Sequence, residues 1–162
     1  MPVRRLHNYA YCQRLFYLQW VEDLWVEDAN TAAGSNLHRN TDKPSHWKDD
    51  LDLAERASLR SLSLESESLG LRGVIDLIED TGTGREIIDY KRGSARRDEN
   101  DQRIAKENDA LQLAAYALLL EEADLPIKKA SVYYGAERSR IPVPLTEALF
   151  EQVRQTITQA RI

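Results

Sequence analysis

A single cysteine, no long apolar run and no excess of positive charge set the first limits on this sequence. With Cys12 alone, no internal disulfide can form, which fits a reducing compartment. No apolar stretch approaches the ~20 residues that a membrane-spanning helix needs, and the N-terminal segment lacks the apolar core of a signal peptide. We therefore expect a cytoplasmic protein with no membrane partner.

The net charge of −5 argues against a general nucleic-acid coat protein, which is usually basic. The charge is nevertheless uneven, because five basic residues lie close together: Arg92, Arg96, Arg97, Arg103 and Lys106. Their pattern alone fits a solvated loop as well as it fits a groove for phosphate groups. An enzyme that holds a metal with carboxylates and DNA with a local basic groove is therefore still allowed.

Length and composition predict one domain with one core, since 162 residues with 42% apolar and 30% charged content are ordinary for a globular domain. The spacing of apolar residues predicts four helices: at 6–20, at 34–39, at 102–124 and after Thr146, the expected N-cap. Pro126 is expected to end the third helix. Residues 40–58 are expected to form an exposed connection.

The strands are predicted from alternation and from short apolar runs. They are expected at 59–69, 71–79, 85–91 and 130–136, with a short one at 140–143. The glycine-rich segment 81–84 predicts a hairpin between the second and third strands. This order of elements predicts an α/β fold in which helices pack on a mixed sheet. The last helix has no stop signal, so we expect the chain to be a piece of a longer protein.

Two aspartates interrupt the apolar strands in the middle of the chain. Asp76 lies within Gly-Val-Ile-Asp-Leu-Ile, and Asp89 and Lys91 end Ile-Ile-Asp-Tyr-Lys. A buried unpaired carboxylate is costly, and two on neighbouring strands also repel each other. A divalent cation would remove both problems. Asp89 and Lys91 are two residues apart, so their side chains point to the same face of the strand.

Such a cluster suits phosphodiester hydrolysis, because Mg²⁺ and Mn²⁺ prefer oxygen ligands and a lysine can stabilise developing negative charge. His38 could add an imidazole, which suits Mn²⁺ better than Mg²⁺. A plain salt bridge between Asp89 and Lys91 and a surface position for His38 are the alternatives. We assign no role to His7 or His46.

Five motifs in order resemble the CRISPR-associated RecB-like nuclease family of the PD-(D/E)xK superfamily. They are Tyr11 to Tyr17, Gly34 to His38, Leu71 to Asp76, Asp89 to Gly93 (Asp-Tyr-Lys-Arg-Gly), and Asn108 to Leu120. The resemblance spans roughly residues 6 to 150 and implies a restriction-endonuclease-like core.

The resemblance also implies the site and its task. The implied metal ligands are His38, Asp76, Asp89 and the main-chain carbonyl of Tyr90, with Lys91 as catalytic lysine and Gln112 and Tyr116 lining the groove. An ordinary polar stripe on the helix is the alternative for Gln112 and Tyr116. Members of this family trim the single-stranded ends of prespacer DNA and check the protospacer-adjacent motif. They work with the CRISPR integrase and its small partner subunit.

The chain departs from the family at its iron–sulfur site. Members hold a 4Fe–4S cluster with four cysteines, and Cys12 matches only the first of them. Either the other three lie beyond Ile162, in which case residues 1–162 are a RecB-like domain cut before a cysteine-bearing segment, or the cluster has been lost. Without the family match, Cys12 would be interpreted as a buried apolar residue.

Contact with DNA requires basic and aromatic side chains. The candidates for phosphate contact are Arg14, Arg92, Arg96, Arg97 and Arg103, and those for base stacking are Tyr17, Trp20 and Trp25. Packing in the core or at its rim is the alternative for the aromatic residues. Three hypotheses follow: a metal-dependent DNA nuclease, a motif-recognition subunit whose cleavage is gated or absent, and a small structural α/β protein.

Overall fold

A computed structural model describes residues 1–24 and 58–161, and its centre is a five-stranded mixed sheet in the order β1-β2-β3-β6-β7. The strands are β1 (Ser58–Ser66), β2 (Leu71–Asp80), β3 (Arg85–Lys91), β6 (Lys129–Tyr134) and β7 (Ser139–Val143). The helices of the described part are α1 (Val3–Tyr11), α2 (Gln13–Trp20), α4 (Glu107–Glu122) and α5 (Glu147–Gln159). The prediction of a mixed sheet flanked by helices is confirmed.

Strand order follows the chain. β1, β2 and β3 form an antiparallel meander, β3 pairs with β6 in parallel, and β6 pairs with β7 antiparallel. The expected hairpin between β2 and β3 is confirmed. Because a parallel neighbour needs a crossover connection, α4 links β3 to β6 across the sheet. The carboxyl end of β3 is thereby brought beside α4.

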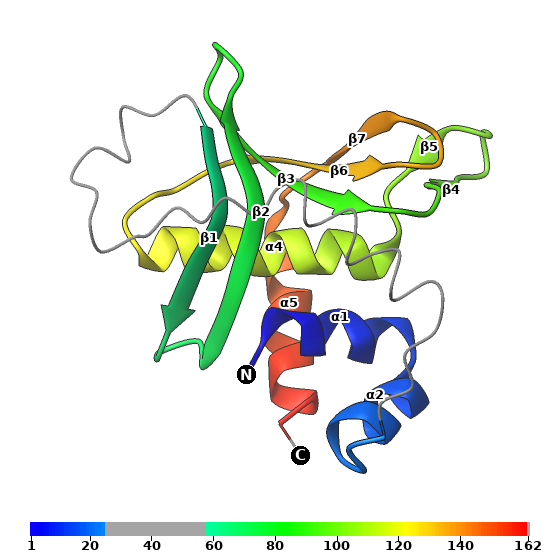
Figure 1. Cartoon of the computed structure of the whole chain (residues 1–162), viewed down its shortest axis with the longest axis vertical. Helices are drawn as coiled ribbons and strands as arrows, with labels where there is room; N and C mark the ends of the chain where they lie inside the picture. Colours follow the sequence, from blue (N-terminus) through cyan, green and yellow to red (C-terminus); the bar gives the residue numbers. More distant parts are fainter. Residues whose placement is uncertain (25–57, 162) are drawn as a thin grey trace.

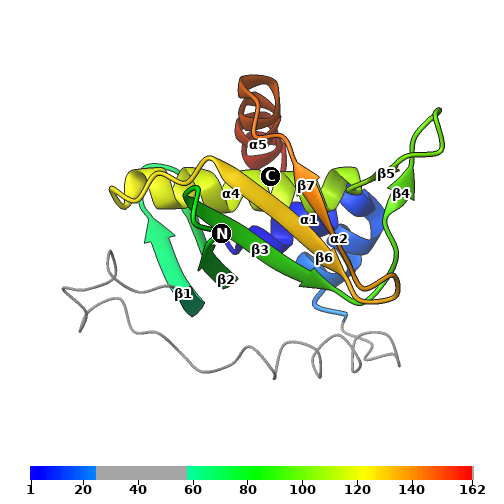
Figure 2. The ribbon, with the colours of Figure 1, turned by 90° about the horizontal axis from the view of Figure 1, so that it is seen from above.

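Helix α4 is the centre of the core. It packs against β1, β2, β3 and β6, and α1 and α5 pack against α4 (Figure 1). Every residue from Leu111 to Leu120 is buried, which explains why this stretch is apolar apart from Gln112 and the hydroxyl of Tyr116. Seen from above, β3 and β6 cross over α4 (Figure 2). Polar side chains that α4 turns toward β3 therefore lie inside the protein.

Two helix predictions were wrong at their boundaries. The helix expected at 6–20 is two helices, because the extended backbone of Cys12 (φ −161°, ψ 110°) ends α1 and caps α2. The helix expected at 102–124 begins only at Glu107, after two short strands form a separate hairpin, β4 (Arg96–Arg97) and β5 (Arg103–Ile104). It ends at Glu122, two residues before the predicted end at 124, and Asp124 adopts a left-handed conformation (φ 59°).

The pairing of β1 with β2 has a local gap that matters for the site. Pairs run from Ser58↔Glu79 to Arg60↔Leu77 and resume at Leu62↔Ile75. Ser61 is left out of this register and has φ 49°. Asp76, the residue opposite it, is left out as well. On β1 the alternation of buried residues changes phase here, and on β2 it gives way to four consecutive buried residues, as expected at a local distortion of the ladder.

The prediction of a helix after Thr146 is confirmed. Thr146 caps α5 by accepting a hydrogen bond from the backbone N–H of Leu149. Within residues 1–24 and 58–161, no helix combines the length and apolarity needed to cross a membrane. The predicted helix at 34–39, together with His38, His46 and Trp25, lies outside the described residues. So does the predicted connection at 40–58, except for its last residue, Ser58, which begins β1.

Candidate active site

The carboxyl end of β3 carries the first two site residues. Asp89 and Lys91 share the strand face that turns toward α4, as their spacing predicted. Lys91 Nζ lies 3.0 Å from Asp89 Oδ2. The Asp89 side chain is only 2% exposed, and Oδ2 has this ion pair but no hydrogen bond of good geometry. The salt bridge considered from sequence as the alternative is therefore present, but its carboxylate is buried rather than exposed.

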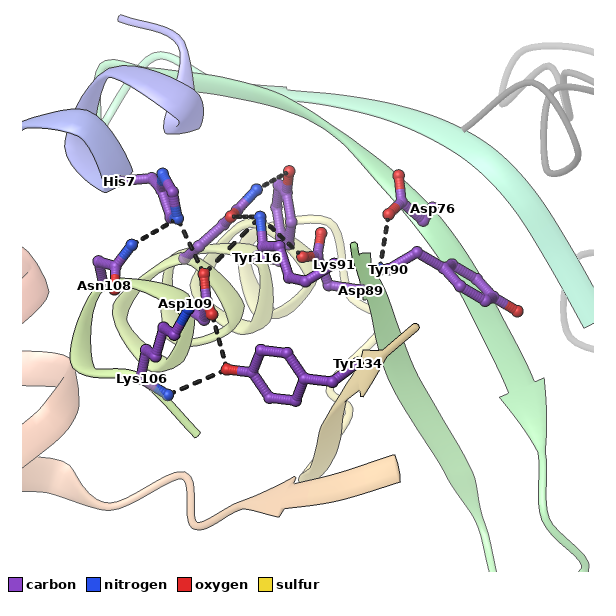
Figure 3. A network of polar contacts seen from close by, with 11 residues as sticks. His7, Asp76, Asp89, Tyr90, Lys91, Lys106, Asn108, Asp109, Tyr116 and Tyr134 are labelled. Carbon is purple, nitrogen blue, oxygen red and sulfur yellow. Dashed lines mark hydrogen bonds and ion pairs between the residues drawn. The ribbon is translucent and has the colours of Figure 1, made fainter. Parts of the chain in front are cut away.

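Asp76 reaches the same place from β2. The backbone N–H of Tyr90 donates to Asp76 Oδ2 at 3.0 Å, so the carboxylate bridges β2 and β3 just beyond their last pair, Leu77↔Ile88 (Figure 3). Asp76 is 8% exposed. Asp76 lies at the gap in the β1–β2 pairing, and its carboxylate turns toward β3. Two buried carboxylates therefore belong to adjoining strands at one sheet end.

The electrostatics of Asp89 reflect this crowding. Burial raises the pKa of its carboxyl to about 6, with a further contribution from the charge of Asp76, although the Lys91 ammonium opposes the shift. Burial alone would lower the pKa of Lys91, but the charges of Asp89 and Asp109 outweigh it and raise that pKa. Lys91 is therefore a stable cation, whereas Asp89 binds a proton more readily than an ordinary aspartate does.

Helix α4 completes the surroundings of Lys91. Gln112 Oε1 accepts a hydrogen bond from Lys91 Nζ at 2.7 Å, and Gln112 Nε2 donates to the Tyr116 hydroxyl at 3.0 Å (Figure 3). Burial raises the pKa of Tyr116, so its hydroxyl keeps its proton. The structure thus brings together Asp76, Asp89, Lys91, Gln112 and Tyr116 from three elements.

A second set of contacts on the other side of Lys91 was missed from sequence. Asp109 Oδ1 lies 3.9 Å from Lys91 Nζ and accepts a hydrogen bond from His7 Nε2 at 2.9 Å. The Tyr134 hydroxyl donates to Asp109 Oδ2 at 2.6 Å. His7 Nε2 also lies 2.8 Å from the side-chain amide of Asn108 (Figure 3).

One signal for this set was present in the sequence. Asp109 lies three residues before Gln112, so both share one face of a helix. No local pattern could place His7, because it lies 102 residues away from Asp109 in the chain. Tyr134 was predicted only as part of the strand at 130–136. The sequence assigned no role to His7, whereas the structure gives it a partner beside the candidate catalytic lysine.

Comparison with known proteins decides the family. A family model described as the PD-(D/E)XK nuclease superfamily matches residues 43–161. The chain belongs to this superfamily. A crystal structure of a protein from Eubacterium rectale shares the fold of this PD-(D/E)XK domain with a TM-score of 0.57 at 10% identity. The match covers 98% of this chain and 77% of that one.

Curated relatives of this PD-(D/E)XK domain carry more specific names. It is 34% identical to a CRISPR-associated exonuclease Cas4/endonuclease Cas1 fusion of Geobacter sulfurreducens, over 98% of this chain and 28% of the relative. It is 33% identical to a CRISPR-associated exonuclease Cas4 of Rhodospirillum rubrum, over 92% of this chain and 45% of the relative. The chain therefore spans about a quarter of the first relative and less than half of the second.

The arginines expected to contact DNA are mostly engaged within this PD-(D/E)XK domain. Ion pairs join Arg96 to Glu107 (3.4 Å), Arg97 to Asp101 (3.3 Å) and Arg103 to Glu137 (3.4 Å). All three arginines belong to the β4–β5 hairpin, which lies at the start of α4 (Figure 2). Such exposed pairs are weak, so each guanidinium can exchange its carboxylate for a phosphate.

The remaining candidates for DNA contact are dispersed. Arg92 is exposed just after β3, and Arg14 is exposed on α2, apart from the hairpin (Figure 1). Tyr17 is half exposed and its hydroxyl donates to Glu22, whereas Trp20 is partly buried. The structure therefore brings Arg92 and the hairpin arginines toward one end of the sheet but does not bring Arg14 there.

Cys12 does not fit the interpretation as a buried apolar residue, because it is exposed. Its Sγ accepts a long contact of 3.5 Å from the backbone N–H of Leu15 at the start of α2. It is also the only cysteine in the sequence. Four thiolates ordinarily hold an iron–sulfur cluster, so these 162 residues do not supply a complete set of ligands.

Proposed function

We propose that this domain is a metal-dependent DNA nuclease whose reaction centre consists of Asp76, Asp89 and Lys91. The observation that carries the proposal is the pair of buried carboxylates on adjoining strands, next to a partly buried ammonium group. Membership of the PD-(D/E)XK nuclease superfamily supports the same chemistry. A structural α/β protein has no need to retain two like charges in one apolar strand end.

The donor set fits a hard divalent cation. Asp89 Oδ2 is buried and, apart from its ion pair with Lys91, has no hydrogen-bond partner, so it offers a lone pair to a cation. We propose Asp76, Asp89, the main-chain carbonyl of Tyr90 and His38 as the ligands. His38 lies outside the described residues, and within residues 1–24 and 58–161 no three His, Cys, Asp or Glu side chains form a metal cluster. His38 is therefore the proposed third side-chain ligand.

A bound Mg²⁺ or Mn²⁺ would supply a Lewis acid for the phosphoryl group and would acidify a water molecule. The protein's own residues then have separate tasks. Lys91 stabilises the charge that develops on the phosphoryl oxygens. Gln112 keeps the ammonium group pointing to this place, and Tyr116 fixes the orientation of the Gln112 amide. Arg92 and the arginines of the β4–β5 hairpin contact the phosphates of the DNA strand.

The substrate and partners are proposed from the relatives. We propose that the domain trims single-stranded overhangs of prespacer DNA and selects ends that carry a protospacer-adjacent motif for insertion into a CRISPR array. The names of the relatives, an exonuclease and an exonuclease–Cas1 fusion, support this substrate class and an integrase partner. The small partner subunit of the integrase and a cytoplasmic location belong to the same proposal.

Cleavage of labelled DNA tests the central part. The chain is incubated with duplexes carrying single-stranded overhangs, with Mg²⁺, with Mn²⁺ or with EDTA. We expect shortening of the overhangs that requires a divalent ion and is lost in Asp76→Ala, Asp89→Ala and Lys91→Ala. The matched control is Asp80→Ala, which removes an exposed carboxylate at the other end of β2. Equal cleavage by the triple-alanine variant would refute the proposal.

A second candidate function is recognition of the DNA motif with cleavage gated by a partner. Two observations favour it: the net charge of −5, and the ion pairs that already engage Arg96, Arg97 and Arg103. Both weaken unaided attraction to DNA. The test compares binding and cleavage by the isolated domain with those of its complex with an integrase. If the isolated domain binds and cuts equally well, gating is excluded.

A further inference from the structure

We propose that Asp109 is a positioning residue that holds the Lys91 ammonium group in place when a cation engages Asp89. This inference rests on the proposed nuclease function, because it assigns a second carboxylate to the same lysine. It concerns a residue outside the predicted site, supplied by α4 rather than by the sheet.

Competition for Asp89 is the reason that a second carboxylate is needed. In the structure, Lys91 Nζ lies 3.0 Å from Asp89 Oδ2, the oxygen that has no hydrogen bond. A cation bound by Asp89 draws the charge of this carboxylate toward itself and repels the ammonium group. Lys91 then keeps the neutral Gln112 Oε1 at 2.7 Å and the charged Asp109 Oδ1 at 3.9 Å. Asp109 is thus the anion that balances Lys91 without binding the cation.

Asp109 is suited to this task because it cannot turn away. Its side chain is 4% exposed, and each carboxylate oxygen has its own donor. His7 of α1 donates to Oδ1 at 2.9 Å, and Tyr134 of β6 donates to Oδ2 at 2.6 Å. The Tyr134 hydroxyl in turn accepts from the backbone N–H of Lys106 at 3.0 Å. Three elements therefore fix the direction in which Oδ1 faces Lys91 (Figure 3).

The charge state of Asp109 agrees with this geometry. Burial alone would raise its pKa, but the hydrogen bond from His7, the charge of Lys91 and the hydrogen bond from Tyr134 outweigh burial and lower it. Asp109 is therefore ionised at neutral pH. Asp89, which is even less exposed, is shifted in the opposite direction. The two carboxylates around one lysine thus differ in character: one is open to a cation and the other is already satisfied.

If Asp109 had a purely structural role, a different experimental result would be expected. In that case the residue only fastens α1 and β6 to α4, and its replacement lowers stability without a specific effect on Lys91. The separating measurement is a ¹⁵N–¹H spectrum of the lysine ammonium groups, recorded with and without Mg²⁺ and with the Lys91 signal assigned by its loss in Lys91→Arg. This readout does not depend on cleavage.

The test uses Asp109→Asn, which keeps the shape and removes the charge. We expect a Lys91 ammonium signal protected from exchange with water in the original chain, with and without Mg²⁺. In Asp109→Asn, we expect this protection to be lost when Mg²⁺ is added. For DNA cleavage, we expect kcat to fall about 10- to 100-fold, by analogy with other residues that orient a catalytic group, while KM stays within about twofold.

Two further variants keep the proposal open to refutation. Tyr134→Phe removes one hydrogen bond to Asp109 but leaves the charge of Asp109, so the loss of Lys91 protection and the fall in kcat should be smaller. If Asp109→Asn does not fold, Tyr134→Phe serves as the test variant in its place. Glu147→Gln removes an exposed carboxylate on α5 and should change neither the signal nor kcat. An unaltered Lys91 signal in Asp109→Asn would overturn the proposal. Absence of cleavage by the original chain would refute the nuclease function instead.

Discussion

Gln112 connects Lys91 to Tyr116 in a fixed direction, with 2.7 Å between Lys91 Nζ and Gln112 Oε1 and 3.0 Å between Gln112 Nε2 and the Tyr116 hydroxyl. An amide can present either its oxygen or its nitrogen to a neighbour. The Tyr116 hydroxyl engages the nitrogen and leaves the oxygen for the ammonium group. The pair of residues thus acts on Lys91 as one unit, although only Gln112 touches it.

Removal of the Tyr116 hydroxyl tests this unit. In Tyr116→Phe the ring still fills its place in the core, but the Gln112 amide loses the contact that orients it. We expect kcat for DNA cleavage to fall about 10-fold with little change in KM. Tyr133→Phe is the matched control. It removes a tyrosine hydroxyl in the same way, but from a ring that packs against Tyr90 on β3 rather than beside Gln112. Equal rates for the two variants would show that the hydroxyl of Tyr116 has no part in orienting the amide.

Replacement of Asp89 should separate stability from activity. Without a divalent ion, Asp89→Asn removes a buried charge that Asp76 repels and that lacks a hydrogen bond on Oδ2. We therefore expect a higher Tm for the variant than for the original chain in EDTA, together with loss of cleavage. Added Mg²⁺ should raise the Tm of the original chain only. A lower Tm of the variant in EDTA would contradict this account of the site.

The pH dependence of unfolding follows from the same carboxyl group. The pKa of Asp89 is about 6 in the folded protein, above its ordinary value of 3.8. Between these values the folded protein binds more protons than the unfolded chain, so this group's contribution to the free energy of unfolding falls as pH rises. Urea titrations in EDTA at about pH 5 and about pH 7 measure it. We expect the original chain to lose more stability than Asp89→Asn over this interval; equal losses would argue against the shift.

A substitution at Gly73 on β2 should change both the stability of the protein and the position of Tyr116 in the site. A Cβ atom added to Gly73 would lie 2.8 Å from Tyr116 Cε1 and 3.1 Å from Val3 Cγ2. We expect Gly73→Ala to lower the free energy of unfolding by about 1–3 kcal/mol and also to lower kcat, because Tyr116 must move. Val74→Ala, at a neighbouring residue that is 51% exposed, should change stability by less than about 0.5 kcal/mol. Similar effects of both would exclude the contact with Tyr116 as the cause.

Replacement of the N-cap of α5 should lower the free energy of unfolding without changing the rate of DNA cleavage. Thr146→Ala removes the hydrogen bond to the Leu149 N–H and should cost about 1 kcal/mol in unfolding experiments. We expect kcat to stay unchanged, since α5 supplies none of the site residues. Thr158→Ala near the other end of the helix, where the hydroxyl binds the Arg154 carbonyl, should cost less. A large fall in kcat for Thr146→Ala would link α5 to the reaction.

Much of this fold was predictable because its signals are local. The alternation of β1, the apolar runs of β2 and β3 and the glycine-rich turn between them each depend on neighbouring residues. The same holds for Asp89 and Lys91, whose common face follows from the period of a strand. The break of the first helix was not predictable from periodicity, because the apolar residues on both sides of Cys12 continue at helical spacing while its backbone is extended.

The site was predictable only in part, for a physical reason. Gln112 and Tyr116 were named through the family resemblance, since a polar pair on a helix does not by itself indicate what it faces. Asp109 and His7 meet across 102 residues, and their contact depends on how α1 packs on α4. Pattern analysis of a single sequence detects neighbours along the chain, whereas these residues become neighbours only through packing.

The left-handed backbone of Ser61 lies opposite Asp76, so we expect the geometry of the candidate site to depend on a residue outside that site. The regular β1–β2 pairing is interrupted where Ser61 faces Asp76, and the Asp76 carboxylate meets the Tyr90 N–H of β3. A β-branched residue at position 61 resists positive φ, and it would press β1 back into regular pairing. Relatives that vary at this position are therefore expected to choose among glycine, asparagine, aspartate and serine. The choice of residue at position 61 on the edge strand β1 is thus restricted by a site whose lysine lies two strands away, on β3.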